Sequence, residues 1–417
     1  MPVRTLPPEL VADILDTFVE VNPSHAARLP NLASFARVDK TWGGIATSYL
    51  YRNLYLDSTA RSGILTALEE NDTLAPLVRV LTLSGGKLTT ADFDRLTGVL
   101  GACTNVRSLS YHCFDAPYLA PLTAFISSAW PNLKYLRADQ SQHLFDLLGR
   151  LQHLEELIAS HVEFPAAAHA LAAATVTPLP PSRPATPGLG EGLQLGTPAA
   201  AAPRPVRPTF RLKRFDSGSS PSPFNFHLLT SSSQSSLRTL DLPISSLTSQ
   251  DLGLFTSLTS LTLTLAERYI PLDADLPAPR QPGQPGTGRS DARCLRRLKR
   301  VLRRADEAGV PLRHLEVYEP RYAATTAFPA EVFEAEDLLG AVPPSVAELD
   351  LATLAVRLSY LNEAFSRTGE AEGEEPKAPV CVGLRTLILG RGSVGSAKEV
   401  GEALEVLAER GVAVRWA

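Results

Sequence analysis

The sequence predicts an α/β protein in which a short helical N-terminal segment precedes a solenoid of repeated strand-and-helix units. Three observations lead to this fold class. A six-residue apolar pattern recurs along most of the 417-residue chain, helical patterns lie between its copies, and the first residues carry helical patterns alone. With 44% apolar residues, the chain can bury a large core or form two or three domains.

The repeated pattern is apolar-x-x-apolar-x-apolar, which places alternate residues of a short strand on one face. Its ten copies begin at Val78, Val106, Leu133, Leu154, Leu212, Leu237, Leu258, Leu312, Val346 and Leu384. The first four copies follow one another at intervals of 28, 27 and 21 residues. A strand and a helix per repeat leave one face of each uncovered, so stacked neighbours stabilise a unit that is unstable alone.

Helical patterns occupy several of the intervals. In TTADFDRLTGVLGA, Thr89 or Thr90 can cap a helix whose Phe93, Leu96 and Leu100 share one face. The other patterns of this kind are SQHLFDLLGRL, TSQDLGLFTSL, EVFEAEDLLGAV, LAVRLSYLNEAFSR and AKEVGEALEVLAERG. This alternation resembles the leucine-rich repeat of the strand-and-helix kind, with ~20–29 residues per unit.

The resemblance to leucine-rich repeats is irregular at one position. That family usually places Asn or Cys at the ninth residue of the repeat, where its side chain binds loop backbone. The residues found there instead are Gly86, Phe114, Ser141, Val162, Ser245 and Gly392. We therefore expect stacked repeats without a regular curvature.

Four segments interrupt the pattern. They are rich in Pro, Ala, Ser or Glu, and the first lacks the periodic apolar residues that would seed a core, so we predict that all four are disordered insertions. Their ranges are 165–208, 217–236, 271–290 and 369–379.

The N-terminal residues carry a set of motifs in a defined order. These are Leu6-Pro7-x-Glu9-Leu10, Ile14-Leu15, Val38-x-x-x-Trp42 and Leu50-Tyr51-Arg52-x-Leu54. In order and spacing they resemble the F-box, which is a module of three helices. We therefore divide the chain into an F-box domain at 1–58 and a leucine-rich-repeat-like solenoid at 59–417. Two features depart from the family pattern: Asp39 stands where many members have Cys or Ser, and the loop Glu20 to Pro30 is long.

The resemblance implies a function. F-box proteins dock onto a Skp-type adaptor, which connects them to a cullin scaffold, and the region that follows holds a protein substrate for ubiquitin transfer. This chain would then be a non-catalytic substrate-recognition subunit of a Skp-cullin-F-box type ubiquitin ligase, with an unknown substrate. The implied adaptor-binding residues, as docking surface or immediate support, are Leu6, Pro7, Leu10, Ile14, Leu15, Val38 and Trp42.

Two alternatives remain open for this region. The same apolar residues could form the core of a helical cap on the solenoid. The chain could also be an interaction scaffold that uses both surfaces without promoting ubiquitination.

The fifth residue of each repeat points away from the core, because it alternates with the apolar fourth and sixth residues. These residues are Thr82, Ser110, Arg137, Ile158, Asp216, Asp241, Thr262, Glu316, Asp350 and Ile388. Four acids against one base suggest a polar, basic ligand, and the candidate substrate-binding residues are Arg137, Asp241, Glu316 and Asp350. An ordinary solvated sheet face is the alternative.

The stretch TLILGRGSVGSAKEV contains Gly390-x-Gly392-x-x-Gly395, which is the spacing of a dinucleotide-binding turn. Such a site needs further parallel strands and an acid about 20 residues on. Arg410 stands at that distance, and the printed sequence stops at Ala417. We therefore expect these glycines to permit a tight strand-to-helix turn, although an oxidoreductase is a third hypothesis. We found no phosphate-binding loop, hydrolase motif or metal-ligand cluster, so we expect no enzyme activity, cofactor or metal.

Charge and composition restrict the partners. A net charge of -4 offers no global positive field for nucleic acid. We expect the basic stretch Arg293 to Arg304 to be an outer helix with a solvated face, or alternatively an import signal or anion-binding site. Four scattered cysteines, no signal peptide and no long apolar run favour a cytoplasmic or nuclear protein without membrane contact.

Overall fold

The structure is a computed structural model of the chain. It describes residues 6–22, 25–57, 61–86, 88–139, 143–159, 210–217, 226, 230–247, 252–265, 289–318, 338–352, 358, 361, 365, 381–390 and 396–417.

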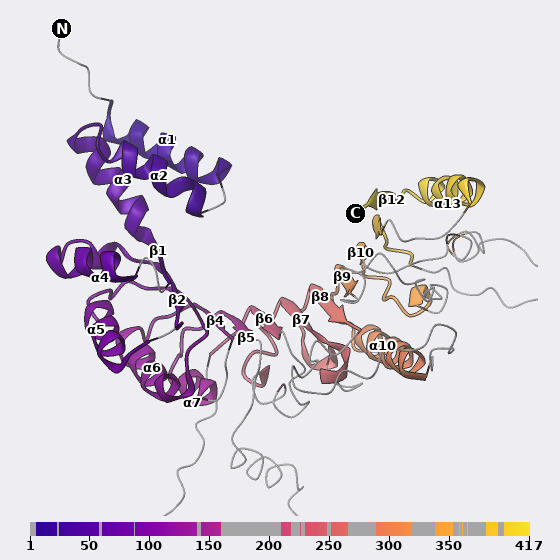
Figure 1. The fold of residues 1–417 in the computed structure, drawn as a ribbon. Helices are drawn as coiled ribbons and strands as arrows, with labels where there is room; N and C mark the ends of the chain where they lie inside the picture. Colours follow the sequence, from indigo (N-terminus) through magenta and orange to yellow (C-terminus); the bar gives the residue numbers. More distant parts are fainter. Residues whose placement is uncertain are drawn as a thin grey trace, which may run out of the picture.

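A parallel sheet of 12 strands, curved along its length, is the centre of the fold (Figure 1). The strands follow one another in sequence order, so each pairs only with its neighbours in the chain. They are β1 Asn53–Leu56, β2 Val80–Ser84, β3 Ser108–His112, β4 Tyr135–Ala138, β5 Glu156–Ala159, β6 Arg214–Ser217, β7 Thr239–Pro243, β8 Ser260–Thr264, β9 His314–Tyr318, β10 Glu348–Leu351, β11 Thr386–Leu389 and β12 Ala413–Trp416.

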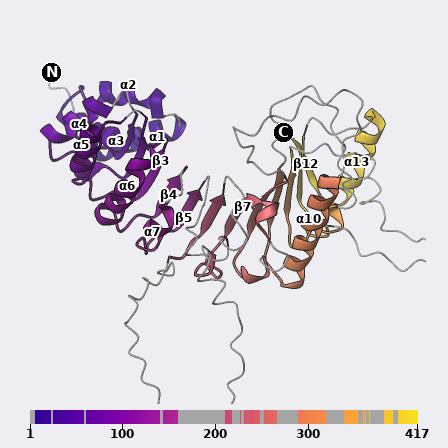
Figure 2. The same ribbon diagram turned by 60° about the horizontal axis from the view of Figure 1, so that its bottom comes forward.

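Helices cover one face of the sheet. In Figure 1 the helices α5, α6, α7 and α10 lie on the outer side of the arc, and Figure 2 shows β4, β5 and β7 running side by side in one direction. The helices are α1 Pro8–Val21, α2 His25–Phe35, α3 Lys40–Arg52, α4 Arg61–Glu70, α5 Thr90–Leu100, α6 Ala116–Ala129, α7 Leu144–Leu148, α10 Arg289–Glu307 and α13 Ala397–Glu409. Short 3₁₀ helices are η1 Ala75–Leu77, η2 Ile244–Ser246 and η3 Leu252–Leu254. The other face of the sheet is the concave face of a solenoid.

The ten predicted repeat strands are confirmed, since each copy of the pattern supplies one strand from β2 to β11. Burial alternates along them as the pattern requires. In β2, for example, Leu81 and Leu83 are buried against the helices while Thr82 is partly exposed. Thr89 caps α5, and its side chain accepts a hydrogen bond from Asp92 N–H. The repeats therefore arise from local pattern and local capping together.

The helices α1, α2 and α3 form a module at one end of the arc (Figure 1). Their core is separate from the long core of the solenoid, and its buried members are Val11, Leu15, Leu32 and Ala46. The predicted three helices are thus present. The sheet begins earlier than expected, because Asn53–Leu56 pair with Val80–Leu83 as β1 and β2. Helix α3 ends at Arg52 and the chain enters β1 at the next residue.

Two further expectations were wrong in part. In the stretch TSQDLGLFTSL, the described residues from Leu252 onward contain the 3₁₀ helix η3 in place of the expected α-helix, and its Gly253 carries no side chain to pack. The range 217–236 is not a simple insertion, because Phe226 is 0% exposed and Ser233 is buried. The Phe226 ring lies between the rings of Phe215 and Phe255, with centroid distances of 6.1 and 5.8 Å. Serine-rich composition concealed an aromatic residue that belongs to the core.

The other predicted insertions lie outside the described residues, except that Arg289 and Ser290 begin α10. A buried aromatic side chain also joins two neighbouring repeats. Trp130 is buried and its Nε1–H donates a 2.8 Å hydrogen bond to the carbonyl of Cys103 in the preceding repeat. Trp130 thus satisfies a buried backbone carbonyl in the loop between helix α5 and strand β3.

Candidate docking surfaces

Helix α1 has two apolar faces with different surroundings. Val11 and Leu15 are 0% exposed and pack into the module core. Leu10 and Ile14, one turn apart on another face, are 48% and 44% exposed. Val21 lies on the same face, because it follows Leu10 by three helical turns. Its side chain is also exposed. An apolar stripe on α1 is therefore uncovered by the described part of the chain.

The other implied adaptor-binding residues fall into two groups. Leu6, Pro7 and Val38 are exposed, Val38 by 60%. Leu15 is fully buried, and Trp42 is partly buried against Phe35, with ring centroids 5.5 Å apart. The first group can contact a partner directly, Leu15 can only support the surface, and Trp42 remains partly exposed.

Asp39 begins α3. Its carboxylate accepts hydrogen bonds from the backbone N–H groups of Thr41 at 2.8 Å and Trp42 at 2.9 Å. This is the N-cap arrangement, in which aspartate and serine serve almost equally well. The departure from the family pattern at Asp39 therefore keeps the helix start.

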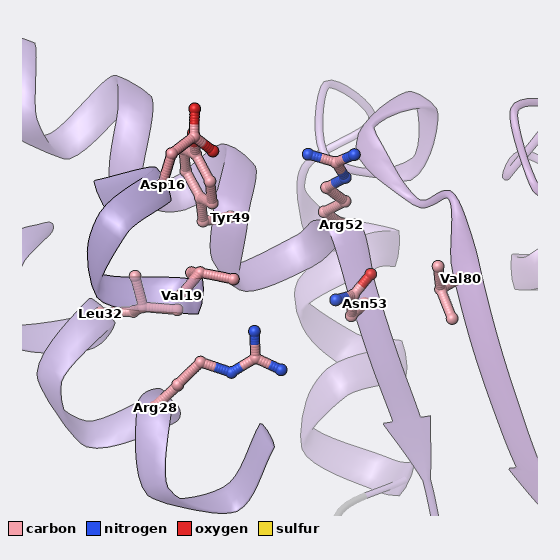
Figure 3. A pocket seen from close by; sticks show the side chains of 8 residues that line it. All are labelled: Asp16, Val19, Arg28, Leu32, Tyr49, Arg52, Asn53 and Val80. Carbon is pink, nitrogen blue, oxygen red and sulfur yellow. The ribbon is translucent and has the colours of Figure 1, made fainter. Parts of the chain in front are cut away.

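A cavity of about 340 Å³ lies where the helical module meets the sheet (Figure 3). All three helices of the module and the first two strands contribute to its lining, so it marks the joint between the two parts. The lining residues are Asp16, Val19, Arg28, Leu32, Tyr49, Arg52, Asn53 and Val80. Figure 3 shows Arg28 extending from α2 toward β1.

One hydrogen bond at the edge of this cavity joins two helices. Tyr49 on α3 donates its hydroxyl proton to Asp16 on α1, at 2.5 Å. Burial, together with this hydrogen bond, raises the pKa of Tyr49 to about 12. The Tyr49 phenol therefore stays protonated at neutral pH and remains the donor of the hydrogen bond to Asp16.

The concave face carries the four candidate substrate-binding residues. Strand register places the fifth residues of the repeats opposite one another, so Arg137, Asp241, Glu316 and Asp350 lie in a single row. Asp216 joins this row directly beside Asp241. The acids thus gather on β6 to β10, at intervals of about 4.8 Å per strand.

Residues of this row make polar contacts within the chain. Arg137 Nε is 3.9 Å from Asp139 Oδ1, and Glu316 accepts a 3.0 Å hydrogen bond from the Thr262 hydroxyl. Asp350 accepts a 2.8 Å hydrogen bond from the backbone N–H of Ala352. These contacts explain the row as a solvated sheet face equally well, and a ligand for it stays a prediction.

Two features of these surfaces were not predicted from the sequence. The cavity at the joint has no local signal, because its lining comes from five separate elements. A second feature was visible but unused: the second residue of most repeats is Lys or Arg, as in VRVLTL, LKYLRA and LRTLDL. These residues immediately precede the strands.

Helix α10 agrees with the prediction that the basic stretch Arg293 to Arg304 is an outer helix with a solvated face. Leu298, Val301 and Leu302 are buried against the solenoid, while Arg300 and Arg303 are exposed. A role in binding an anion or in nuclear import stays a prediction.

Gly390 has a structural explanation. A Cβ atom at this position would lie 1.9 Å from the carbonyl oxygen of Ala352, so the ends of β10 and β11 meet too closely for a side chain. Gly392 and Gly395 lie outside the described residues. Close contact between the strand ends therefore accounts for the first glycine of the motif Gly390-x-Gly392-x-x-Gly395.

Two searches of the described residues were negative. No group of three or more His, Cys, Asp or Glu side chains gathers there as a metal site. No helix in that part of the chain is both long and apolar enough to span a bilayer.

Comparisons with known proteins give little. No protein-family model matches the sequence, and no curated protein matches it. A solved structure, the crystal structure of the Rad7 and Elc1 complex in yeast, matches with 14% identity and a TM-score of 0.35. The match covers 99% of this chain and 80% of that chain. A likeness of this size supports no conclusion about fold or function.

Proposed function

We propose that this chain is a substrate receptor of a Skp-cullin-F-box type ubiquitin ligase, which docks a Skp-type adaptor through α1 to α3 and holds a protein substrate with the solenoid. The observation that carries the proposal is the uncovered stripe of Leu10 and Ile14 beside the buried Val11 and Leu15. An amphipathic helix in a small module normally buries its whole apolar face. Here a second apolar face faces solvent at the positions that the F-box resemblance implies.

The energetics favour a partner on this face. Fully burying a leucine side chain contributes about 1.5–3 kcal/mol, and roughly half of Leu10 and Ile14 is already covered. Each would then add about 1 kcal/mol on docking. Val38 and Leu6 are further exposed apolar side chains of the module. The core of the three helices alone is too small to bury these side chains.

The proposed role is non-catalytic. A receptor of this kind raises the effective concentration of a substrate lysine near a charged ubiquitin carrier, and it needs no bond-making side chain. The arc of the solenoid offers an extended concave face for a substrate, separate from the adaptor-binding helices (Figure 1).

Adaptor docking is tested by co-purification. We expect the double variant Leu10→Ser, Ile14→Ser to lose at least about ten-fold in affinity for a Skp-type adaptor, because two apolar contacts are removed. Leu254→Ser is the matched control, since Leu254 is 41% exposed on the solenoid. Equal adaptor binding by all three proteins would refute the docking surface.

Ligase function is tested separately. In a reconstituted ligase that contains the adaptor and cullin, co-purifying proteins should be ubiquitinated with the wild-type chain and not with the double variant. Adaptor binding without ubiquitination of any co-purifying protein would favour the non-ligase scaffold.

A further inference from the structure

One edge of the solenoid carries a row of positive charge. The row consists of the residue just before each strand start, and we call it the cationic row. Its members, from β1 to β11, are Arg52, Arg79, Arg107, Lys134, Glu155, Lys213, Arg238, Thr259, Arg313, Ala347 and Arg385. Eight of these eleven are basic, in a chain whose net charge is -4.

Backbone hydrogen bonds fix the spacing of the cationic row. Each member donates its N–H to the carbonyl of the member before it, as Thr259 does to Arg238 at 3.0 Å and Arg313 does to Thr259 at 2.9 Å. Ala347 and Arg385 continue this ladder, each at 2.8 Å. The members therefore repeat at the strand spacing of about 4.8 Å, although long segments separate some of them in sequence.

The chain itself shows how this row holds a carboxylate. Glu155 lies between two basic members, and its carboxylate contacts Lys134 Nζ at 2.9 Å and Lys213 Nζ at 2.6 Å. The two lysines are on strands two apart, about 9.6 Å by strand spacing. Hydrogen bonds from Lys213 and Lys134 hold the pKa of Glu155 below its usual value. One acid is thus stabilised by two cations of the row.

The same arrangement occurs twice more with a neutral residue in the middle. Thr259 lies between Arg238 and Arg313, and Ala347 lies between Arg313 and Arg385. All three arginines are exposed. In the described part of the chain, their guanidinium groups make no hydrogen bond or ion pair, and the Thr259 hydroxyl donates to the backbone carbonyl of Arg238 at 3.3 Å. We call these two places the neutral notches.

We propose that the neutral notches bind an acidic segment of a partner protein, with one carboxylate over Thr259 and the next over Ala347. Each incoming carboxylate would lie between two arginines in the same way as the Glu155 carboxylate lies between Lys134 and Lys213. The site goes beyond the proposed function and does not need the adaptor.

The spacing selects the form of the segment. The notch centres lie two strands apart, which is about 9.6 Å. A polyproline II helix has three residues per turn and a rise of about 3.1 Å, so side chains at i and i+3 point the same way about 9.3 Å apart. The matching segment has an acidic residue at every third position and is rich in proline. Nucleic acid fits less well, because the cationic row has no aromatic member on which a base could stack.

Binding can be measured with a labelled peptide of three Glu-Pro-Pro repeats and the full chain, by fluorescence anisotropy at low salt. The matched probe has the same composition with its three glutamates adjacent. We expect the repeat peptide to bind more tightly, because only its carboxylates match the notches. Low salt is needed, since exposed ion pairs are screened.

Substitutions give the sharper test. Arg313→Gln removes a cation from both notches, whereas Arg238→Gln and Arg385→Gln each affect one. At about 0.2–1 kcal/mol per exposed pair, we expect each of the latter to weaken binding about 1.4- to five-fold, and Arg313→Gln, which removes two pairs, about two- to thirty-fold. Arg300→Gln on α10 makes the same charge change elsewhere and should have little effect.

A last variant fills a notch from within. Ala347→Glu should place a carboxylate between Arg313 and Arg385, as Glu155 does in its own place, and so block the peptide, while Ala347→Ser should not. Thermal unfolding confirms that each variant is folded.

Equal affinity for the two peptides, or equal loss with Arg313→Gln and Arg300→Gln, would overturn the proposal. Tighter binding of single-stranded DNA with the same arginine dependence would also overturn it, in favour of a nucleic-acid site.

Discussion

Tyr49 and Asp16 share a hydrogen bond of 2.5 Å that joins α3 to α1 across the helical module. It lies at the edge of the cavity between this module and the sheet (Figure 3). Asp16 stands on α1, whose other residues Leu10 and Ile14 form the exposed stripe. The bond therefore helps to fix the helix that presents the proposed docking surface.

Replacing this tyrosine tests the bond. We expect Tyr49→Phe to lower the free energy of unfolding by about 0.5–1.5 kcal/mol, because the hydrogen bond to Asp16 is lost while the ring remains. Chemical denaturation at pH 7 measures the change. An unchanged unfolding free energy would mean that solvent replaces the bond without cost.

The same pair predicts a pH dependence at the alkaline end. The pKa of Tyr49 in the folded protein is raised to about 12 from an ordinary value of 10. Stabilisation by a group with a raised pKa is fully present below the unfolded value and is lost as the pH rises through the folded value. The stability difference between wild type and Tyr49→Phe should therefore shrink between pH 10 and pH 12. A difference that stays constant over this range would contradict the assignment.

Asp39 should act as a helix cap. We expect Asp39→Ala to lower the free energy of unfolding by about 0.5–2 kcal/mol, because the N–H groups of Thr41 and Trp42 lose their acceptor. Asp39→Ser should restore most of this loss, since a serine hydroxyl can accept the same bonds. If serine proves no better than alanine, the carboxylate has another role.

The two glycines Gly390 and Gly401 should respond in opposite ways to alanine. Gly390→Ala brings a Cβ against the Ala352 carbonyl, and we expect a loss of about 1–3 kcal/mol in unfolding free energy. Gly401 lies in α13 with no atom near its Cβ position, so Gly401→Ala should stabilise by up to about 1 kcal/mol. Thermal and denaturant unfolding compare the two variants. A neutral Gly390→Ala would remove the packing explanation for that glycine.

Phe226 should behave as a core residue despite its serine-rich surroundings. We expect Phe226→Ala to cost about 3–5 kcal/mol, because its buried ring contacts those of Phe215 and Phe255. Val382→Ala is the control, since Val382 is exposed and should change stability by less than about 0.5 kcal/mol. Similar unfolding curves for the two variants would show that the segment is not part of the core.

Much of the fold was predictable because its pattern is local. The alternation in copies such as Leu237 to Leu242 specifies which side chains face the helices, and the Thr89 cap specifies where a helix begins. The start of the sheet at Asn53 was not predictable, because the helical spacing of the N-terminal motifs continues through this residue. The role of Phe226 was hidden because the serine-rich composition around it is typical of a disordered segment.

The sequence by itself determined the repeated strands, the helices α5, α7, α10 and α13 and the two-faced apolar pattern of α1, because each depends on residues a few positions apart. Only the tertiary structure decided which apolar face of α1 stays exposed, and that second residues from distant repeats form one evenly spaced row. The reason is that strand pairing joins segments far apart in sequence. Glu155 and Lys213 become neighbours through a backbone hydrogen bond of 2.7 Å, and a local pattern cannot specify such a contact.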